Sequence, residues 1–425
     1  MFHATTRSRL LLTILTAALL VGTAFGASAR ERVAPWSIGK LMKGNTVTPP
    51  TPVQADLSRL RWDPGNARTN SPINNPDIQV FPSADPQTEV SVSVSYTNPM
   101  RFLITSNTTP TATGQGYFYS LNNGATWFGS NSFPNGNANF GDPVSLHDNL
   151  GNTFDVTLRS PSGIGLISSA DYGVTWGGFS NIDPLNSSGC DKEMGHVDRK
   201  VGSPFENQVY VAWTDFNLTD PHVILTRSGD GYAARTDLSA ALGPDLGQGV
   251  DITTGPGGQV YACWAVYAGG FLPEAGIGFA RSTNGGVSWT PGSQIFAITG
   301  IRSSNGPNVD FNNTRVNGFP SISCDISTGA NSGRIYIVYS DRSTGDSDIY
   351  LRHSDDQGSS WSAAVRVNPD PVSNGKQQWF PWIDCDPVSG DVSISYFSMD
   401  TGGSGFQTKT WVSHSTDGGN TFDSF

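Results

Sequence analysis

The chain has 425 residues, of which 14% are charged, and its formal net charge is −11. An acidic surface of this size argues against nucleic acid and anionic membranes as partners, because both carry negative charge themselves. The 49 glycines, the 11 tryptophans and the low charged fraction are typical of an all-β extracellular protein, and they argue against a helical one.

Residues 1–29 have the layout of a secretory signal peptide. Arg7 and Arg9 precede an apolar run over residues 10–20, and the Ala-Ser-Ala of residues 27–29 offers a cleavage site. The run is too short to cross a bilayer, and no other stretch is long or apolar enough, so we predict no membrane span. Cleavage near Ala29 would change the net charge from −11 to −13, because it removes two arginines and no acid, and would leave a secreted or periplasmic chain.

Residues 30–75, rich in Pro, Asn and Thr, are expected to form an extended leader with little core of its own. Residues 76–425 then carry one repeated pattern, which predicts a single domain. Five good copies read SLNNGATW, SADYGVTW, STNGGVSW, SDDQGSSW and STDGGNTF, and a damaged copy, SGDGYA, begins at Ser228. The copies are spaced by about 50 to 70 residues, a period typical of repeat architectures.

The copies are interpreted as structural turns. Their Ser and Asp or Asn side chains can bind backbone amides, their Gly allows a conformation that a Cβ disfavours, and their aromatic ring packs back over the sheet. The residues concerned are Ser120 and Trp127; Ser169, Asp171, Gly173 and Trp176; Ser282 and Trp289; Ser354 and Trp361; and Ser415, Asp417 and Phe422.

Short apolar runs with a period of two surround each copy. In one unit they read FPSISCD, RIYIVYSD and DIYLRHS before the turn and AAVRV after it. Such runs, separated by Gly, Asn and Asp, indicate antiparallel strands. Four strands in each unit of roughly 50 residues predict one blade of a β-propeller. Six units therefore predict an all-β, six-bladed propeller of four-stranded antiparallel blades.

The last unit ends shortly after Phe422, so its fourth strand is expected to be missing from the C-terminus. An unclosed ring would leave backbone groups unpaired at a sheet edge. The stretch DIQVF, residues 77–81, is therefore predicted to supply that strand and to close the ring.

The four cysteines, Cys190, Cys263, Cys324 and Cys385, could form two disulfides outside the cytoplasm, in any of three connectivities. No Cys-x-x-Cys or His-x-x-x-His spacing indicates a zinc site. No cofactor is expected, and a structural calcium stays open because no motif indicates one. The chain is taken to be a monomer.

The repeated turn resembles the Asp box, Ser-x-Asp-x-Gly-x-Thr-Trp, of the sialidase-like β-propellers, and the resemblance covers residues 77–425. It implies Asp boxes at the hairpins between third and fourth strands and, in an exo-α-sialidase, a glycoside hydrolase site with three arginines, an Asp acid/base and a Tyr nucleophile activated by a Glu. The chain departs from this family where a Phe/Tyr-Arg-Ile-Pro motif is expected, because that position reads Gln87-Thr88-Glu89-Val90. The departure argues against hydrolysis of ordinary sialosides.

The axial mouth opposite the turns is the expected site of chemistry. Acids, amides and aromatic rings gathered there would suit a sugar, because hydroxyls need acceptors and donors and pyranose faces pack on rings. The catalytic candidates are Glu193 and Asp191 as acid or base and Tyr267 as nucleophile; the binding candidates are Arg315, Arg342, Lys192, Asp341, Gln378 and Trp379; other mouth residues are Glu89, Asp142, Gln248, Asp251 and Glu274. Two alternatives stay open: Glu193 as a solvated rim residue beside Lys192, and Arg342 as a partner of rim acids.

Three alternative functions are compatible with these residues. The chain is an exported glycoside hydrolase acting on an extracellular glycan or glycoprotein, a non-catalytic propeller that binds a glycan or protein at the same mouth, or a structural propeller with a solvated rim. The fold does not decide between them, because propellers host many unrelated activities.

Overall fold

The computed structural model describes residues 79–424, apart from residues 85, 109–113, 135–138, 219–220, 244, 271–272, 304–307, 312 and 400–407. The predicted signal peptide and leader, residues 1–29 and 30–75, lie outside the described residues. Within the described part, no helix has the length and hydropathy needed to traverse a bilayer.

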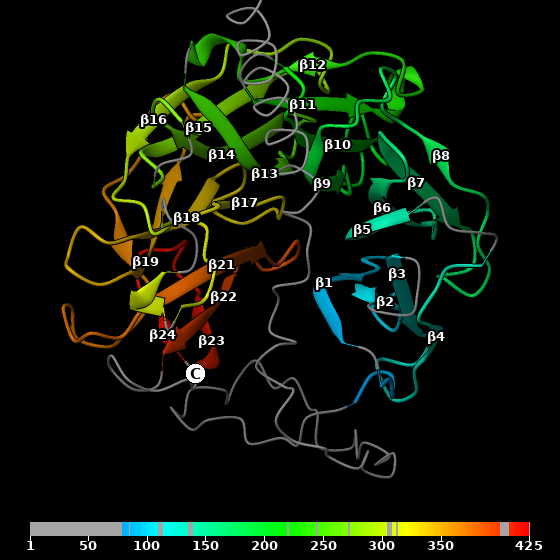
Figure 1. Cartoon of the computed structure of the whole chain (residues 1–425), viewed down its shortest axis with the longest axis horizontal. Coiled ribbons are helices and arrows are strands. Elements are labelled where there is room, and N and C mark those ends of the chain that lie inside the picture. Colours follow the sequence, from blue (N-terminus) through cyan, green and yellow to red (C-terminus); the bar gives the residue numbers. More distant parts are fainter. Residues whose placement is uncertain are drawn as a thin grey trace, which may run out of the picture. The chain divides into compact units, whose positions relative to one another are not determined.

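The described chain folds into six antiparallel sheets of four strands each, which are arranged as blades around an axis (Figure 1). The prediction of a six-bladed propeller is therefore confirmed. Blade one is β1 (Gln87–Val94), β2 (Phe102–Thr108), β3 (Gly114–Ser120) and β4 (Phe128–Ser130); blade two is β5 (Asn139–His147), β6 (Thr153–Arg159), β7 (Ile164–Ser169) and β8 (Ser180–Asn181); blade three is β9 (Cys190–Val197), β10 (Val209–Asp215), β11 (His222–Arg227) and β12 (Thr236–Asp237). Blade four is β13 (Leu246–Thr254), β14 (Val260–Tyr267), β15 (Gly276–Ser282) and β16 (Ser293–Ala297); blade five is β17 (Ser321–Cys324), β18 (Ile335–Asp341), β19 (Asp348–Ser354) and β20 (Val365–Arg366); blade six is β21 (Gln378–Cys385), β22 (Val392–Met399), β23 (Thr408–Ser415) and β24 (Asp423–Ser424).

Helical structure among the described residues is confined to three short 3-10 turns: η3 (Ser228–Asp230), η4 (Ala240–Leu242) and η5 (Val309–Phe311). The first of them occupies the place of the damaged repeat. Its Ser228 hydroxyl accepts the Val209 amide at 2.9 Å, so the serine still ties the end of its blade to a neighbouring strand.

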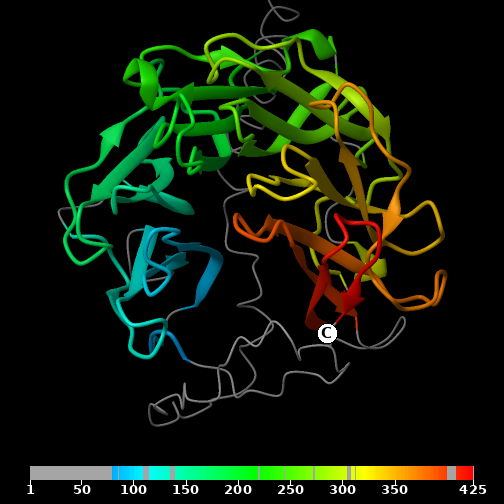
Figure 2. The same ribbon diagram turned by 180° about the vertical axis from the view of Figure 1, so that it is seen from behind.

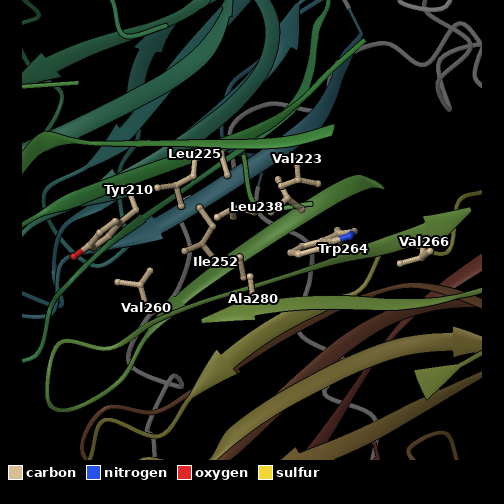
Figure 3. Packing of buried hydrophobic residues seen from close by; sticks show 12 residues of the cluster. Tyr210, Val223, Leu225, Leu238, Ile252, Val260, Trp264, Val266 and Ala280 are labelled. Atoms are coloured by element: carbon tan, nitrogen blue, oxygen red, sulfur yellow. The ribbon is translucent and has the colours of Figure 1, made fainter. Parts of the chain in front are cut away.

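The hydrophobic core lies between neighbouring blades. Figure 3 shows one such layer, in which Tyr210 and Leu225 of blade three pack against Ile252 and Trp264 of blade four. The second strands β10, β14 and β18 are buried along their whole length, because a blade covers each of their two faces. Burying one Val, Leu or Ile side chain completely contributes about 1.5 to 3 kcal/mol, so these layers supply much of the stability of the ring.

The five good copies of the repeat form hairpins between third and fourth strands, here called the marker hairpins. In each, the Ser hydroxyl accepts the amide of the Gly four residues later at 2.8–2.9 Å. The Asp or Asn Oδ1 accepts the amide four residues after it at 2.8–3.0 Å. Their interpretation as structural turns is confirmed. Because first strands run antiparallel to second strands, the marker hairpins lie at the pole opposite the starts of the first strands.

The marker hairpins also join blades. Gly358 of blade five has φ +82°, and a Cβ built on it would lie 2.3 Å from the ring of Phe279 in blade four. Gly173 of blade two likewise faces Leu103 and Tyr119 of blade one. The glycine therefore allows a left-handed backbone in every copy and, at Gly286, Gly358 and Gly419, also a close approach to the preceding blade.

The predicted closure of blade six is wrong. Its fourth strand is β24, which pairs with β23 through His414 opposite Asp423. Of the stretch 77–81, the described residues 79–81 form no strand, and the ring of Phe81 instead packs on Phe118 of β3 with centroids 4.9 Å apart. The prediction overestimated the length that a fourth strand needs, since β8, β12 and β20 also have only two residues.

All four cysteines are free thiols, so the structure contains neither of the two disulfides considered from the sequence. Cys263, Cys324 and Cys385 are buried in the layers between blades, where they pack as small apolar side chains. Burial raises the pKa of each of these thiols, which keeps them protonated.

Candidate functional site

First strands share a backbone irregularity near the mouth. In five of the six, the pairing with the second strand shifts register within a few residues of the strand start. Each shift holds one residue with a left-handed backbone: Glu89 (φ 51°), Asp142 (φ 55°), Lys192 (φ 52°), Gly249 (φ 71°) and Phe380 (φ 51°). We call these the mouth bulges.

The residue types at the mouth bulges are informative. A left-handed backbone costs a residue with a Cβ about 1 to 2 kcal/mol, and glycine avoids this cost. Blade four has Gly249 at the position, whereas the first three blades have Glu89, Asp142 and Lys192. Bulges re-aim side chains and are common next to active sites. Three strained, charged residues from consecutive blades therefore mark the mouth as the candidate site.

The carboxyls of Glu89 and Asp142 lie close enough to each other for their titrations to interact. Asn107 holds the second member: its Oδ1 accepts the Asp142 amide at 2.8 Å, and its Nδ2 donates to Asp142 Oδ1 at 3.5 Å. Solvent reaches Glu89, while Asp142 is half-buried. Asn107 thus fixes Asp142 in place, while Glu89 is the member that a ligand can approach.

The two members of this pair titrate in opposite directions. Although Glu89 is exposed as a residue, desolvation of its carboxyl among the neighbouring side chains, followed by the hydrogen bond and the charge of Asp142, raises its pKa to about 8. Burial alone would raise the pKa of Asp142 too, but the hydrogen bond from Glu89 and the charge of Lys192 outweigh it and lower that pKa. At neutral pH one proton therefore resides on Glu89 and Asp142 is ionised.

The next blade adds Asp191, Lys192 and Glu193. Burial, followed by repulsion from Asp142, raises the pKa of Asp191 to about 6. Burial would lower the pKa of Lys192, but the carboxylates around it, Asp142 first, raise it instead. Lys192 is therefore a fixed positive charge among acids.

Glu193 lies beneath the mouth surface. It is 1% exposed, and neither carboxyl oxygen has a hydrogen-bond partner among the described residues. Burial, followed by repulsion from Asp142, raises the pKa of Glu193 well above its ordinary value. The raised pKa suits an acid, but the burial separates Glu193 from bulk solvent, and its catalytic role stays a prediction.

Tyr267 and Glu274 meet, as the resemblance implies for a nucleophile and its activator. The Tyr267 hydroxyl donates to Glu274 Oε1 at 3.3 Å. However, Tyr267 is fully buried, and burial followed by the Glu274 charge raises its pKa, which is opposite to activation. Glu274 also accepts the amides of Ile301, Arg302 and Gly318 at 3.0, 3.0 and 2.6 Å. The pair anchors the segment that follows blade four.

The segment held by Glu274 contains Arg302, an arginine of the site that sequence reasoning missed. Arg302 Nη1 donates to Gln248 Oε1 at 3.2 Å, and Gln248 Nε2 donates to Asp191 Oδ2 at 3.2 Å. Its guanidinium lies over the Tyr267 ring, 5.4 Å from the centroid. Arg302 follows a fourth strand in irregular chain, so no sequence pattern pointed to it.

Arg315 joins the same cluster. It is exposed, and its charge acts on both Asp142 and Asp191, lowering the pKa of each. The structure therefore places Arg315, Asp191, Lys192 and Glu193 in one cluster with Glu89 and Asp142.

Other predicted binding residues have structural partners. Gln378 is fully buried and its Nε2 donates to the Ser398 hydroxyl at 3.0 Å, while Trp379 is 6% exposed and packs between Phe311 and Phe397. The next residue, Phe380, is the one at the bulge and is 40% exposed. Sequence reasoning missed this aromatic side chain by one position.

The remaining two candidates lie at the end of β18. Asp341 is 9% exposed and accepts the Ser343 amide at 2.6 Å. Arg342 Nη2 pairs with Asp310 Oδ2 at 2.6 Å, which is the alternative that the sequence left open for it.

Metal-type clusters of three or more His, Cys, Asp or Glu side chains are absent from the described residues. A structural calcium remains untested.

No family model matches the chain, and no curated protein matches it. Solved structures do resemble it. A protein of unknown function from Dyadobacter fermentans is 14% identical, with 77% of this chain and 94% of that one covered and a TM-score of 0.48. An intramolecular trans-sialidase from Ruminococcus gnavus gives 10% identity, 75% and 92% coverage and a TM-score of 0.48. The GH93 α-L-arabinofuranosidase of Fusarium graminearum is 12% identical, with 73% of this chain and 88% of that one covered and a TM-score of 0.45. These likenesses concern the propeller fold.

Proposed function

We propose that this chain is an exported glycoside hydrolase that acts on an extracellular glycan at the mouth. The Glu89–Asp142 pair carries the proposal. It holds one protonated and one ionised carboxyl at neutral pH, on two strained bulges that open to solvent. Two carboxyl groups whose pKa values are driven apart are the usual basis of acid–base catalysis on a glycosidic bond.

Glu89 is the proposed general acid. Glu89 is exposed as a residue, so a glycosidic oxygen can approach it from the mouth. Its raised pKa keeps the proton available at pH 7 for transfer to the leaving group. Asp142 stays ionised, which holds the proton on Glu89 before the reaction and favours the positive charge that develops on the sugar.

Asp191 is the proposed second carboxylate of the reaction. With a pKa of about 6 it is mostly ionised at pH 7 and can act as base or nucleophile at the sugar. Gln248 orients it through the 3.2 Å hydrogen bond to Oδ2. Lys192 and Arg315 balance the acids, which allows them to be close without all being protonated.

The substrate class that fits best is a neutral glycoside. The mouth lacks the Phe/Tyr-Arg-Ile-Pro arginine, and Arg342 pairs with Asp310. The ionised carboxylates of Asp142 and Asp191 would repel a sugar carboxylate. Exposed Phe380 supplies an aromatic ring at an equivalent bulge, where a pyranose face can pack.

Binding of a glycan or glycoprotein without turnover is the second candidate. The state of Tyr267 favours it, because that side chain is buried with a raised pKa, and Glu193 is also buried. Two of the three catalytic candidates from the sequence thus lack direct access to a ligand.

The test is an assay of the mature chain on a panel of chromogenic neutral glycosides and sialosides. Glu89→Gln removes the proton donor and should lower kcat by about 10²- to 10⁴-fold, with circular dichroism unchanged. Asp310→Asn, which removes a rim carboxyl outside the cluster, is the matched control and should retain activity. Retention on a glycan array that Glu89→Gln abolishes, with no sugar released from any substrate, would instead establish the binding function.

A further inference from the structure

Blade one exposes an apolar face on the side away from blade two. The hydroxyl of Ser93 lies 2.6 Å from His147 Nδ1 of blade two, so that side of β1 is covered. Side chains alternate along a strand, and Val92 therefore points the opposite way. Val90 and Val92 are 61% and 62% exposed.

Blade six exposes a similar face on the side away from blade five. The Cys385 amide donates to the Ser323 hydroxyl of blade five at 3.1 Å, and Ile383 is buried on that side. Trp382 alternates with these two residues and is 51% exposed. Val412, which shares a row with Trp382 across the sheet, is 40% exposed.

These two faces belong to neighbouring blades, since blade six follows blade five and blade one precedes blade two around the ring (Figure 2). We call the space between them the seam. Near the axis, Tyr96 of blade one and Asp384 of blade six line one cavity, so the blades approach each other there. Along the seam, however, four large apolar side chains are at least 40% exposed, whereas the other layers between blades are closely packed.

The chain enters the propeller on this face. Phe118 shares a row with Ile104 and Val92 across the first three strands of blade one, so its side chain lies on the seam side. Phe81 covers Phe118, with ring centroids 4.9 Å apart. The Ser83 hydroxyl accepts a hydrogen bond from Asn131 Nδ2 at 2.8 Å, which fixes the segment there. The described chain therefore begins at the seam.

We propose that residues 48–78 of the same chain dock in the seam and complete the packing between blades one and six. This stretch contains Val53, Leu57, Leu60 and Trp62 within ten residues. It also has the reach to do so, because the chain from Trp62 to Gln79 can extend about 55 Å, roughly twice the length of an eight-residue strand. Docking buries Val90, Val92, Trp382 and Val412.

The experiment is hydroxyl-radical footprinting of the full mature chain, read by mass spectrometry at Trp382. The wild type should show slow oxidation of Trp382, and the double variant Leu57→Asp with Leu60→Asp should raise its rate several-fold. Ser58→Asp places the same charge between the two leucines and should leave the rate close to that of the wild type.

A second variant tests the contact directly. Leu60→Cys combined with Val92→Cys should form a disulfide under mild oxidation, detected as a linked peptide, while Ser58→Cys with Val92→Cys should form much less. Fast oxidation of Trp382 in the wild type would overturn the proposal. Protection of Trp382 that the leucine variants leave unchanged would also overturn it, because the blades would then close on each other. Protection that is lost on dilution would overturn it as well, because a second copy of the chain would then fill the seam.

Discussion

The two poles of the propeller place different residue types in left-handed backbone. At the marker hairpins the position belongs to glycine in every good copy, for example Gly173 (φ 91°) and Gly358 (φ 82°). At the mouth bulges Glu89, Asp142 and Lys192 take the same kind of backbone without being glycine. Both poles therefore hold non-glycine residues in left-handed backbone, since Asn123, Tyr172 and Gln357 precede the marker glycines with φ 58°, 60° and 59°, but only at the mouth are such residues charged.

The difference separates structure from function within one repeat. The marker hairpins need from the glycine only a left-handed backbone and, in three copies, close approach to the preceding blade, so the same residue recurs. The mouth bulges tolerate strain because a charged side chain is aimed into the mouth. Identical residues in every blade indicate packing, whereas residues that vary at equivalent strained positions indicate a site.

The largest effect is expected at Asp142. Asp142→Asn keeps a residue that adopts left-handed backbone readily, but it removes the charge that helps hold the proton on Glu89. The pKa of Glu89 should fall from about 8 toward 4.5, so activity on a neutral glycoside should decline at lower pH than in the wild type. Each unit of the fall lowers the protonated fraction at high pH about tenfold. A pH–rate profile measures the shift; an unchanged alkaline limb would remove Glu89 as the acid.

At the opposite pole, Gly358→Ala should destabilise the fold without changing the chemistry. A Cβ there meets the Phe279 ring at 2.3 Å and adopts φ +82°. Strain of about 1 to 2 kcal/mol, with the clash in addition, predicts a loss of at least 2 kcal/mol in the free energy of unfolding. Urea unfolding measures it. Ser359→Ala, one residue away, is the control, and activity per folded molecule should stay constant in both variants.

The repeated features of the fold could be predicted from the sequence, whereas the features that depend on strand register could not. Blade number, strand number and the marker hairpins follow from local patterns that recur. Sequence reasoning placed Glu89 and Asp142 at the mouth but assigned them no role, since the bulges that aim them are not visible in the sequence. A shift of one residue reverses the face of a strand, which is why Trp379 was chosen and Phe380 is the exposed ring. Arg302 depends on Glu274 binding three backbone amides, a tertiary contact with no local signal.

Glu89→Gly is the opposite of Gly358→Ala, because it introduces a glycine at a left-handed position instead of removing one. Glycine relieves the left-handed strain at φ 51° but adds freedom to the unfolded chain, so the two effects largely offset each other. The free energy of unfolding should rise by up to about 1 kcal/mol while activity is lost. Thermal unfolding and the glycoside assay on one preparation measure both. A loss of stability comparable to that of Gly358→Ala would show that the charged residue at the bulge supports the fold.

The smallest effect is the dependence of stability on pH. The folded-state pKa of Glu89 is raised to about 8 and that of Asp191 to about 6, so between their ordinary values and these values the folded chain binds more protons than the unfolded chain. Their contribution to stability is therefore fully present below about pH 4 and is lost as the pH rises through 6 and then 8. Urea unfolding from pH 5 to 9 should show Glu89→Gln declining less steeply than the wild type, while Asp310→Asn follows the wild type. Parallel curves for all three would mean that Glu89 titrates normally, and the mouth pole would then lose the electrostatic difference that distinguishes it from the marker pole.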